Sequence, residues 1–560
     1  MAEVQQAPML SSVALFEETA TEPGAKYGFF SQQFHEQIAK FPSLSQNNGI
    51  PTPRLTPSWL QHFEDVYFSH VYYSFPFLNP VDWHGKHLAR VLTSGASDYN
   101  EDLNNADPTA LCMVDLIYAL GALWSTRLQL EQCLPVSERF FLAAKKLICL
   151  DDLETPSMLL AQTLLLITQY CVARTHRQRG FMHAALTYLG LAIRVCRSLR
   201  FPSIQYADTL AEQDTIALKL WWSCIYYDIV FASTCGEPTM VDPREYRVAD
   251  KFQLGLKDSS TQRLHFSPYS YFENNVRLSI MIRNLCAELH EASPDHQTNL
   301  QGRFFNGDFS LLQRHEMNLT RWFTRLPAEL TIECRCTIFD KHLMLEQRLN
   351  LHIRYYYAQI LLYRPAISFL LKLQAKLQCV EVLDDHNFEG SFAQDALRRF
   401  ASKCLQAAVN TIDLLHTYLG TGGESMTPVR NFTPLCFYLY NAMLVMIAAR
   451  CCANDGLCEV NLHKKWHQAS KIMQFYQATI STIELPFKFF EVINERLFQG
   501  ADEGEPAANL QQFSESWNMF DWYHEDAAFN QDESPQLVQN QAAQTVDTMS
   551  SQWLGSFLSL

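Results

Sequence analysis

One nearly uninterrupted apolar run, Ile216 to Cys235, constrains the fold of this chain more than any other stretch. Its apolar residues recur at helical spacing along one face, at Leu218, Trp221, Trp222, Ile225 and Ile229. The opposite side is apolar too, with Ile216, Leu220 and Tyr227. A helix that is apolar nearly all round is typical of one enclosed by other helices. We therefore expect this helix at the centre of the fold, with Trp221 and Trp222 in its core.

The flanking sequence frames this central helix. Residues Gly180 to Arg200 have the periodicity of a second amphipathic helix, which Pro202 ends because proline cannot continue a helix. Gly236 and Pro238 supply a break after the central run.

Composition favours a large helical body. Only 20 of the 560 residues are glycine, about half the usual ~7%, and 48% are hydrophobic. We predict an all-α fold, a large multi-helix bundle over residues 58–499, between a disordered N-terminal tail (1–57) and an acidic C-terminal tail (500–560). The predicted helices are Trp59–Ser74, Ala110–Leu130, Val136–Cys149, Pro156–Ala173, Phe181–Leu199, Ile216–Cys235, Tyr271–His290, Leu311–Leu326, Phe339–Tyr363, Pro365–Leu377, Phe392–Tyr418, Pro434–Ala453 and Lys465–Ile483.

Several segments, taken in order, resemble the middle regulatory region of fungal zinc-cluster transcription factors. The central pair is "HAALTYLGLAIRVCRSLRF" followed by "LKLWWSCIYYDIVFASTCGEPTMVDPREYRV". The opening "HFEDVYFSHVYYSFPFLNPVDW", the later "WFTRLPAEL" and the late helix "LHIRYYYAQILLYRPAI" agree with the same pattern. The resemblance covers about residues 60 to 450. It implies an all-helical nuclear regulator of transcription, an activator of pathway genes such as a biosynthetic gene cluster.

The six-cysteine zinc cluster that precedes this region in the family is absent here. The first cysteine is Cys112, inside a predicted helix, so no zinc cofactor is expected from the residues present. Outside the acidic tail the chain carries 44 basic and 49 acidic residues, which gives no electrostatic footprint for duplex DNA. Direct DNA binding is therefore not expected. DNA would be reached through a partner regulator or a zinc cluster missing from this sequence, and the family resemblance also admits a homodimer.

Two charged residues at positions of the family's motif lie on otherwise apolar helices. These are Arg194 and Asp228. Because an unpaired buried charge is costly, we expect the two to pair with each other or with other groups in the central bundle. This role is structural. The motif's basic residues before the tryptophan pair are reduced here to Lys219.

The last sixty residues have the composition of an activation segment. They hold ten of the 59 acidic residues and none of the 44 basic ones. Aromatic residues are interleaved with these acids, which is typical of disordered activation segments that fold onto a coactivator. The candidate anchors are Phe513, Trp517, Phe520, Trp522 and Tyr523. The alternative is a C-terminal helix that docks on the body.

The sequence contains little evidence for other functions. The segment "DDHNFE", with Asp384 and Asp385, is similar to the magnesium motif of all-helical terpene synthases, but the second motif of that family is missing, so a solvated loop is favoured. A cytoplasmic helical scaffold is the third function class.

The basic run Arg174–Arg179 is interpreted as a solvated helix end rather than a binding site. The sixteen cysteines contain no C-x-x-C pair and are expected to be reduced and buried.

No membrane contact is expected. The best candidate span, Leu435 to Ala449, is about 22 Å long as a helix, short of the ~30 Å hydrocarbon core.

Overall fold

The chain is predominantly helical wherever its structure is described. The computed structural model describes residues 55–83, 107–148, 150–174, 180–204, 212–235, 238–246, 269–289, 302–304, 306–332, 341–379, 392–418, 433–452 and 462–477, together with residues 300 and 334. Every regular element in these ranges is a helix, so the predicted all-α class is confirmed for them. The predicted tails lie outside the described residues, apart from positions 55–57.

The first half of the body buries one hydrophobic cluster, which we call the first core. Its main helices are α2 (Pro57–Val66), α5 (Pro108–Trp124), α6 (Leu130–Leu147), α7 (Met158–Arg174), α8 (Gly180–Ser198) and α10 (Glu212–Cys235). Short helical turns connect them, at η1 (Tyr67–Val71), η2 (Tyr72–Ser74), α3 (Pro80–Trp83), η6 (Leu150–Glu154) and α9 (Phe201–Ile204). Helix α5 packs against α2, α6 and α7, while α7 also packs along α8.

Helix α5 shows how the sequence sets these boundaries. The Asp107 side chain accepts a hydrogen bond from the Thr109 backbone N–H at 2.9 Å, which caps the first turn. Pro108 follows at the first helical position, where its missing N–H costs nothing.

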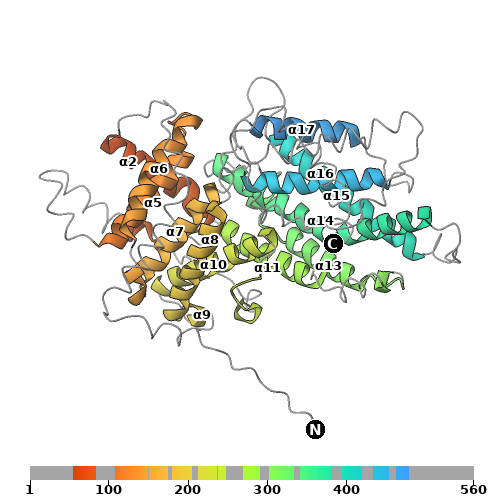
Figure 1. Cartoon of the computed structure of the whole chain (residues 1–560), viewed down its shortest axis with the longest axis horizontal. Coiled ribbons are helices and arrows are strands. Elements are labelled where there is room, and N and C mark those ends of the chain that lie inside the picture. The colour runs from red at the N-terminus through yellow and green to blue at the C-terminus, as the bar shows by residue number, and fades with distance from the viewer. Residues whose placement is uncertain are drawn as a thin grey trace, which may run out of the picture.

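The second half buries another cluster, the second core. It is built from α13 (Ser310–Thr324), α14 (Lys341–Cys379), α15 (Phe392–Tyr418), α16 (Thr433–Cys451) and α17 (Leu462–Gln477), with a short turn η8 (Ala328–Leu330) before α14. Helix α14 packs along α15 and α16, and α17 lies on α15 and α16. Figure 1 shows this group beside the helices of the first core.

Helix α11 (Ser270–Leu289) joins the two cores. Its residues Phe272, Val276 and Ile280 are buried in the first core. Leu278 and Ile282, which lie between and beyond them along the same helix, are buried in the second. In Figure 1 the helix lies between the two groups, next to α10 on one side and α13 on the other.

Two predicted breaks are wrong because a proline lies inside a helix. The sequence predicts separate helices on either side of Pro365, but α14 runs through it. A proline in a helix interior costs about 3 kcal/mol. Here the next residues, Ala366 and Ile367, are fully buried in the second core, and this burial opposes the cost. Helix α6 likewise begins before Pro135, not after it.

The helix predicted at Trp59–Ser74 is regular only to Val66. It continues as the π-helical turn η1 and the 3-10 turn η2. The described helices include none that is both long and apolar enough to cross a bilayer.

Candidate functional site

The central helix α10 is enclosed, as its periodicity predicts. It packs against α7, α8, α9 and α11. The side chains of Trp221 and Trp222 are 0% and 1% exposed, which agrees with their predicted place in the core. Residues on both sides of the helix, such as Leu220 and Ile225, are also fully buried. Polar groups on this helix must therefore find partners inside the protein.

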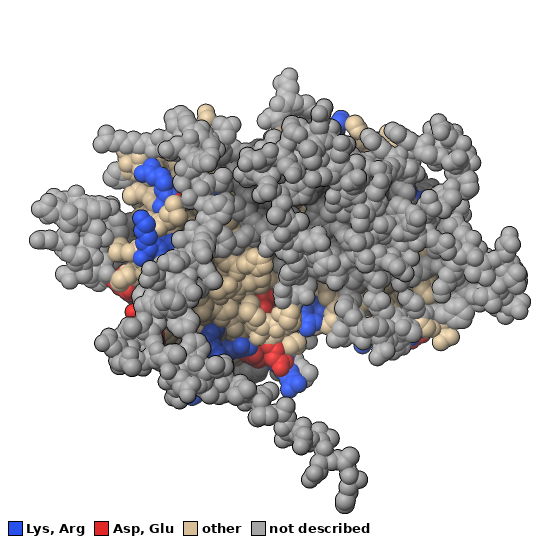
Figure 2. Space-filling view, in the orientation of Figure 1, with Lys and Arg blue, Asp and Glu red and all other residues tan. Residues whose placement is uncertain are grey.

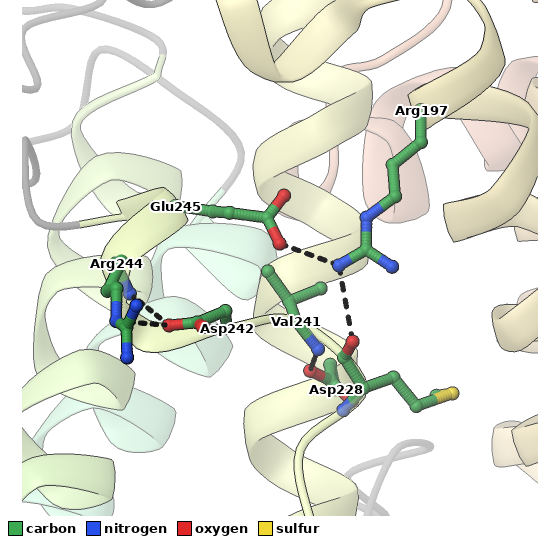
Figure 3. A network of polar contacts seen from close by, with 7 residues as sticks. Arg197, Asp228, Val241, Asp242, Arg244 and Glu245 are labelled. Atoms are coloured by element: carbon green, nitrogen blue, oxygen red, sulfur yellow. Dashed lines mark hydrogen bonds and ion pairs between the residues drawn. The ribbon is translucent and has the colours of Figure 1, made fainter.

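Asp228 finds its partners in the backbone of the segment that follows the helix. This residue is only 3% exposed. Its Oδ1 accepts a hydrogen bond from the Met240 N–H and its Oδ2 one from the Val241 N–H, both at 2.9 Å. Burial raises the pKa of Asp228, and these two backbone hydrogen bonds oppose that rise. We infer the ionised form, because both oxygens act as acceptors. The carboxylate thus ties residues 240 and 241 to the central helix (Figure 3).

A second anchor holds the same segment from helix α8. Arg197 Nη2 donates to the Met240 carbonyl at 3.2 Å and to Glu245 Oε1 at 2.7 Å. The Asp242 side chain accepts from the Arg244 backbone N–H at 2.8 Å, which closes a local turn. Figure 3 shows Arg197 and Asp228 approaching the segment from two helices. Residues 238–246 are therefore clamped between α8 and α10.

The predicted role of Arg194 is wrong. Its side chain is exposed, and Asp228 pairs with backbone N–H groups instead. The arginine that reaches this region is Arg197, three residues later, which is also one of the charges that lower the pKa of Asp228. Three residues turn a helix by about 300°, so the two arginines lie about 60° apart around α8; this difference leaves Arg194 exposed while Arg197 contacts Met240 and Glu245. The opposite charges of Arg197 and Glu245 could have suggested this ion pair. Because the two residues are 48 positions apart in the sequence, no local pattern links them.

Asp228→Asn is expected to lower the free energy of unfolding by about 2 kcal/mol. An amide offers one acceptor oxygen, so its NH2 group would face the N–H of Met240 or Val241 and one charge-assisted hydrogen bond would be lost. Denaturant titration of the purified chain measures the change. Asp242→Asn is the matched control, because Asp242 is exposed and accepts through one oxygen only; we expect a change within about 0.5 kcal/mol. Equal effects of the two substitutions would contradict the proposed anchor.

A further polar group, absent from the sequence predictions, joins the two cores. Arg354 of α14 is 3% exposed. Its Nη1 donates to Asn275 Oδ1 and its Nη2 to Ser279 Oγ at 2.7 Å, both on α11. The guanidinium also lies over the ring of Tyr226 on α10, 5.1 Å from the centroid, and hydrogen-bonds with Tyr438 on α16. One side chain thus contacts three other helices. The sequence feature that could have indicated this buried contact is the presence of an arginine within the aromatic run of the late helix.

The basic residue at the end of α7 is not solvated as predicted. Arg174 is fully buried. Its Nη1 donates to the Tyr170 hydroxyl at 3.0 Å and its guanidinium lies 5.0 Å from the Phe181 ring centroid. The interpretation of a solvated helix end is therefore wrong for this residue, while 175–179 lie outside the described part of the chain.

Lys219, the remaining basic residue before the tryptophan pair, is also buried. Its ammonium lies 3.6 Å from the ring centroid of Tyr269. Burial lowers the pKa of Lys219 to about 8, against the opposing effect of Glu273. The residue belongs to the packed interior and not to an exposed regulatory surface.

The other predicted sites cannot be placed. The candidate activation anchors, from Phe513 to Tyr523, and the acidic pair Asp384 and Asp385 lie outside the described residues. Within the described ranges no cluster of His, Cys, Asp and Glu has the arrangement of a metal site. Ten cysteines have described side chains; all ten carry free thiols, and all but Cys286 and Cys334 are buried.

Comparison with known proteins gives one family and several relatives. Residues 65–323 match the family model described as the fungal specific transcription factor domain. Three curated proteins are similar over longer stretches. The chain is 22% identical over 388 residues to the sorbicillinoid biosynthetic cluster transcription factor 2 of Penicillium rubens. It is 23% identical over 350 residues to the transcriptional activator protein acu-15 of Neurospora crassa, and 22% identical over 300 residues to the activator of stress genes 1 of Saccharomyces cerevisiae.

These alignments cover only part of each protein. They span 67%, 59% and 49% of this chain, but 52%, 35% and 28% of the three relatives in the same order. The chain therefore spans about half or less of the curated relatives it matches. No solved structure matches this chain.

Proposed function

We propose, from the match of residues 65–323 to the fungal specific transcription factor domain, that the chain is a transcriptional regulator, an activator of pathway genes. The observation that carries the proposal is the match itself, together with three similar proteins that are named as transcription factors or activators. One of these relatives regulates a biosynthetic gene cluster, as its name states, and we propose this class of target for the present chain. The matched family is one of transcription factors, so we propose a role in binding and not in catalysis.

The charge of the body supports an indirect route to DNA, because residues 1–500 carry 44 basic and 49 acidic residues and so no excess of positive charge. On the face seen in Figure 2, described lysine and arginine residues lie in small separate groups among uncharged and acidic side chains. Sequence-independent DNA binding depends on a continuous basic surface. We therefore propose that the body works in the nucleus and reaches DNA through a partner regulator or a zinc cluster. The other proposed partner is a coactivator, bound by the acidic aromatic tail. No zinc is proposed for the described body.

The tail makes the activator role testable. Residues 501–560, fused to an unrelated DNA-binding domain, are expected to activate a reporter gene. Replacing Trp517, Phe520, Trp522 and Tyr523 by alanine should abolish this activity, because interface energy concentrates in a few buried aromatic anchors. Changing two or three acids to Asn or Gln should weaken it only partly, because the acids mainly speed encounter.

Equal expression of the fusions, checked by immunoblot, is the control for this series. A fusion that is inactive, or that keeps its activity without the aromatics, contradicts activation by the tail. A tagged copy of the full chain that stays out of the nucleus contradicts the wider proposal.

A further inference from the structure

Helix α17 presents a basic face with an exposed aromatic ring. The opposite face of this helix packs on α15 and α16, with Trp466, Ile472 and Met473 buried in the second core. In Figure 1 the helix lies at the edge of that core. Its exposed residues, which we call the outer face of α17, are His463, Lys464, His467, Lys471, Gln474 and Phe475.

The positive charge of α17 is not balanced by acids of the same helix. Its sequence contains three lysines and no aspartate or glutamate. Lys465 forms an ion pair with Asp413 of α15, whereas Lys471 forms none within the described chain. The pKa of His416 on α15 is lowered by burial, raised by Asp413 and lowered by all three lysines. Three cations and one acid thus act at the same place, which leaves an excess of positive charge.

Phe475 adds an apolar contact to this face. Its side chain is 37% exposed, and it follows Lys471 by four residues, so the two lie on neighbouring turns of the same side. A segment that carries both acids and aromatic rings can form ion pairs with the lysines, ring contacts with Phe475 and cation–π contacts with Lys471. The outer face therefore fits an acidic aromatic segment better than a purely acidic one.

Residues 501–560 of the same chain have this chemistry in their sequence. They lie outside the described residues, but they contain ten acids and no lysine or arginine. The candidate anchors, from Phe513 to Tyr523, are interleaved with or followed by Glu515, Asp521, Glu525 and Asp526. The net charges of this segment and of α17 are opposite, so the two attract each other.

The connection between α17 and the acidic segment allows them to meet within one chain. Helix α17 ends at Gln477, and Asp502, the first acid of the segment, follows 25 positions later. Twenty-five residues span at most ~85 Å when extended and ~38 Å as a helix, whereas α17 itself is ~24 Å long. The acids can therefore reach any point of the outer face. A tether that spans the distance raises the effective concentration of the attached segment to about the millimolar range.

Helix α13 is the alternative basic surface, and its charges favour it less. Arg321 and Arg325 are exposed there. The same helix also carries Glu316, and Glu288 of α11 pairs with its Arg314. These acids would repel an acidic segment, whereas α17 contains no acid of its own.

From these observations we propose that the outer face of α17 binds the acidic aromatic segment 501–560 of the same chain. The contact itself does not depend on the proposed function. Its regulatory meaning rests on that function, because a segment held on α17 is not available to a coactivator.

Carbodiimide cross-linking of the purified full-length chain tests the contact. The reagent joins a lysine amine to a carboxylate that touches it, and mass spectrometry identifies both residues. We expect Lys464 and Lys471 to be linked to acids of residues 501–560, about fivefold more often than Lys146, which is exposed on α6. An equal mixture of unlabelled and nitrogen-15-labelled chain should give links within one chain and not between two.

A double variant tests the two kinds of contact on the outer face. Lys471→Glu combined with Phe475→Ser should lower the remaining cross-links from Lys464 about fivefold, because it reverses one charge and removes the exposed ring. Replacing the four aromatic anchors of the reporter test by alanine should have a similar effect. Arg321→Glu combined with Met317→Ser is the matched control, since both residues are exposed on α13 with the same spacing, and it should leave the cross-links unchanged.

Four results would overturn the proposal. These are no cross-link from Lys464 or Lys471 to residues 501–560, equal cross-linking from Lys146, links only between different chains, or links that the folded Lys471→Glu and Phe475→Ser variant leaves unchanged. The first three need no variant, so they decide the matter if the double variant fails to fold. Because cross-linking measures contact and not activation, its outcome is independent of the reporter test of the isolated segment.

Discussion

Gly121→Ala is expected to lower the free energy of unfolding by about 3 kcal/mol or more. A Cβ atom at this position of α5 would lie 2.0 Å from the Phe63 carbonyl oxygen and 2.6 Å from its carbonyl carbon. Both atoms belong to the backbone of α2, so no side-chain rotation relieves the clash and the two helices must separate. Overpacking usually costs 1–3 kcal/mol, and here it far outweighs the ~1 kcal/mol that alanine gains over glycine in a helix.

Gly190→Ala is the control for this prediction. Gly190 lies inside α8, and a Cβ atom there would meet only the Met240 sulfur atom at 3.4 Å, the far end of a flexible side chain. We expect this variant to be neutral or more stable by up to about 1 kcal/mol. Denaturant titration of both variants gives the comparison. If alanine is tolerated equally at both positions, the close packing of α2 on α5 is not the reason for glycine at position 121.

Trp221→Ala is expected to cost about 3–5 kcal/mol, the usual range for truncating a buried aromatic side chain. The side chain is fully buried in the first core, on the helix that contacts α7, α8, α9 and α11. Its removal leaves a cavity that four surrounding helices cannot easily close. The measurement is again the free energy of unfolding, supported by the melting temperature.

Trp221→Phe keeps an aromatic ring at this position and so removes much less volume than Trp221→Ala. The Trp221 Nε1 atom is buried without a hydrogen-bond partner among the described residues, so its removal sacrifices no hydrogen bond. We expect this variant to lose about 1–2 kcal/mol, well below the alanine variant. A Trp221→Ala protein with the original melting temperature would show that the central helix is not part of the core.

The sequence allowed the helices and their buried faces to be predicted because these depend on local periodicity. The central helix begins at Glu212 rather than Ile216 and ends at Cys235 as expected, and the predicted helix Phe392–Tyr418 matches α15 at both ends. The prediction at Pro365 was wrong because the burial of Ala366 and Ile367, which opposes the proline cost, comes from packing far away in the chain.

The polar contacts between elements could not be predicted from the sequence. Asp228 was expected to meet a charge, but the backbone of residues 240 and 241 folds back onto it. Whether Arg194 or Arg197 contacts residues 238–246 depends on the rotation of α8 against its neighbours, which periodicity alone does not resolve. Arg354 meets Asn275 and Ser279 across more than 70 residues of chain. Such pairings are consequences of tertiary structure.

Helix α11 also determines what counts as one folding unit. Helix α11 buries Phe272 in the first core and Ile282 in the second. If the helix separates from either core, the residue that it buries there becomes exposed. Opening one core therefore removes part of the other, and the two are expected to unfold in a single cooperative transition. The family match ends at residue 323, before α14 and its Arg354. The end of the family match is therefore not the end of a cooperatively folded unit. A fragment that ended at residue 323 would keep α11 but lose many of the residues that pack against it.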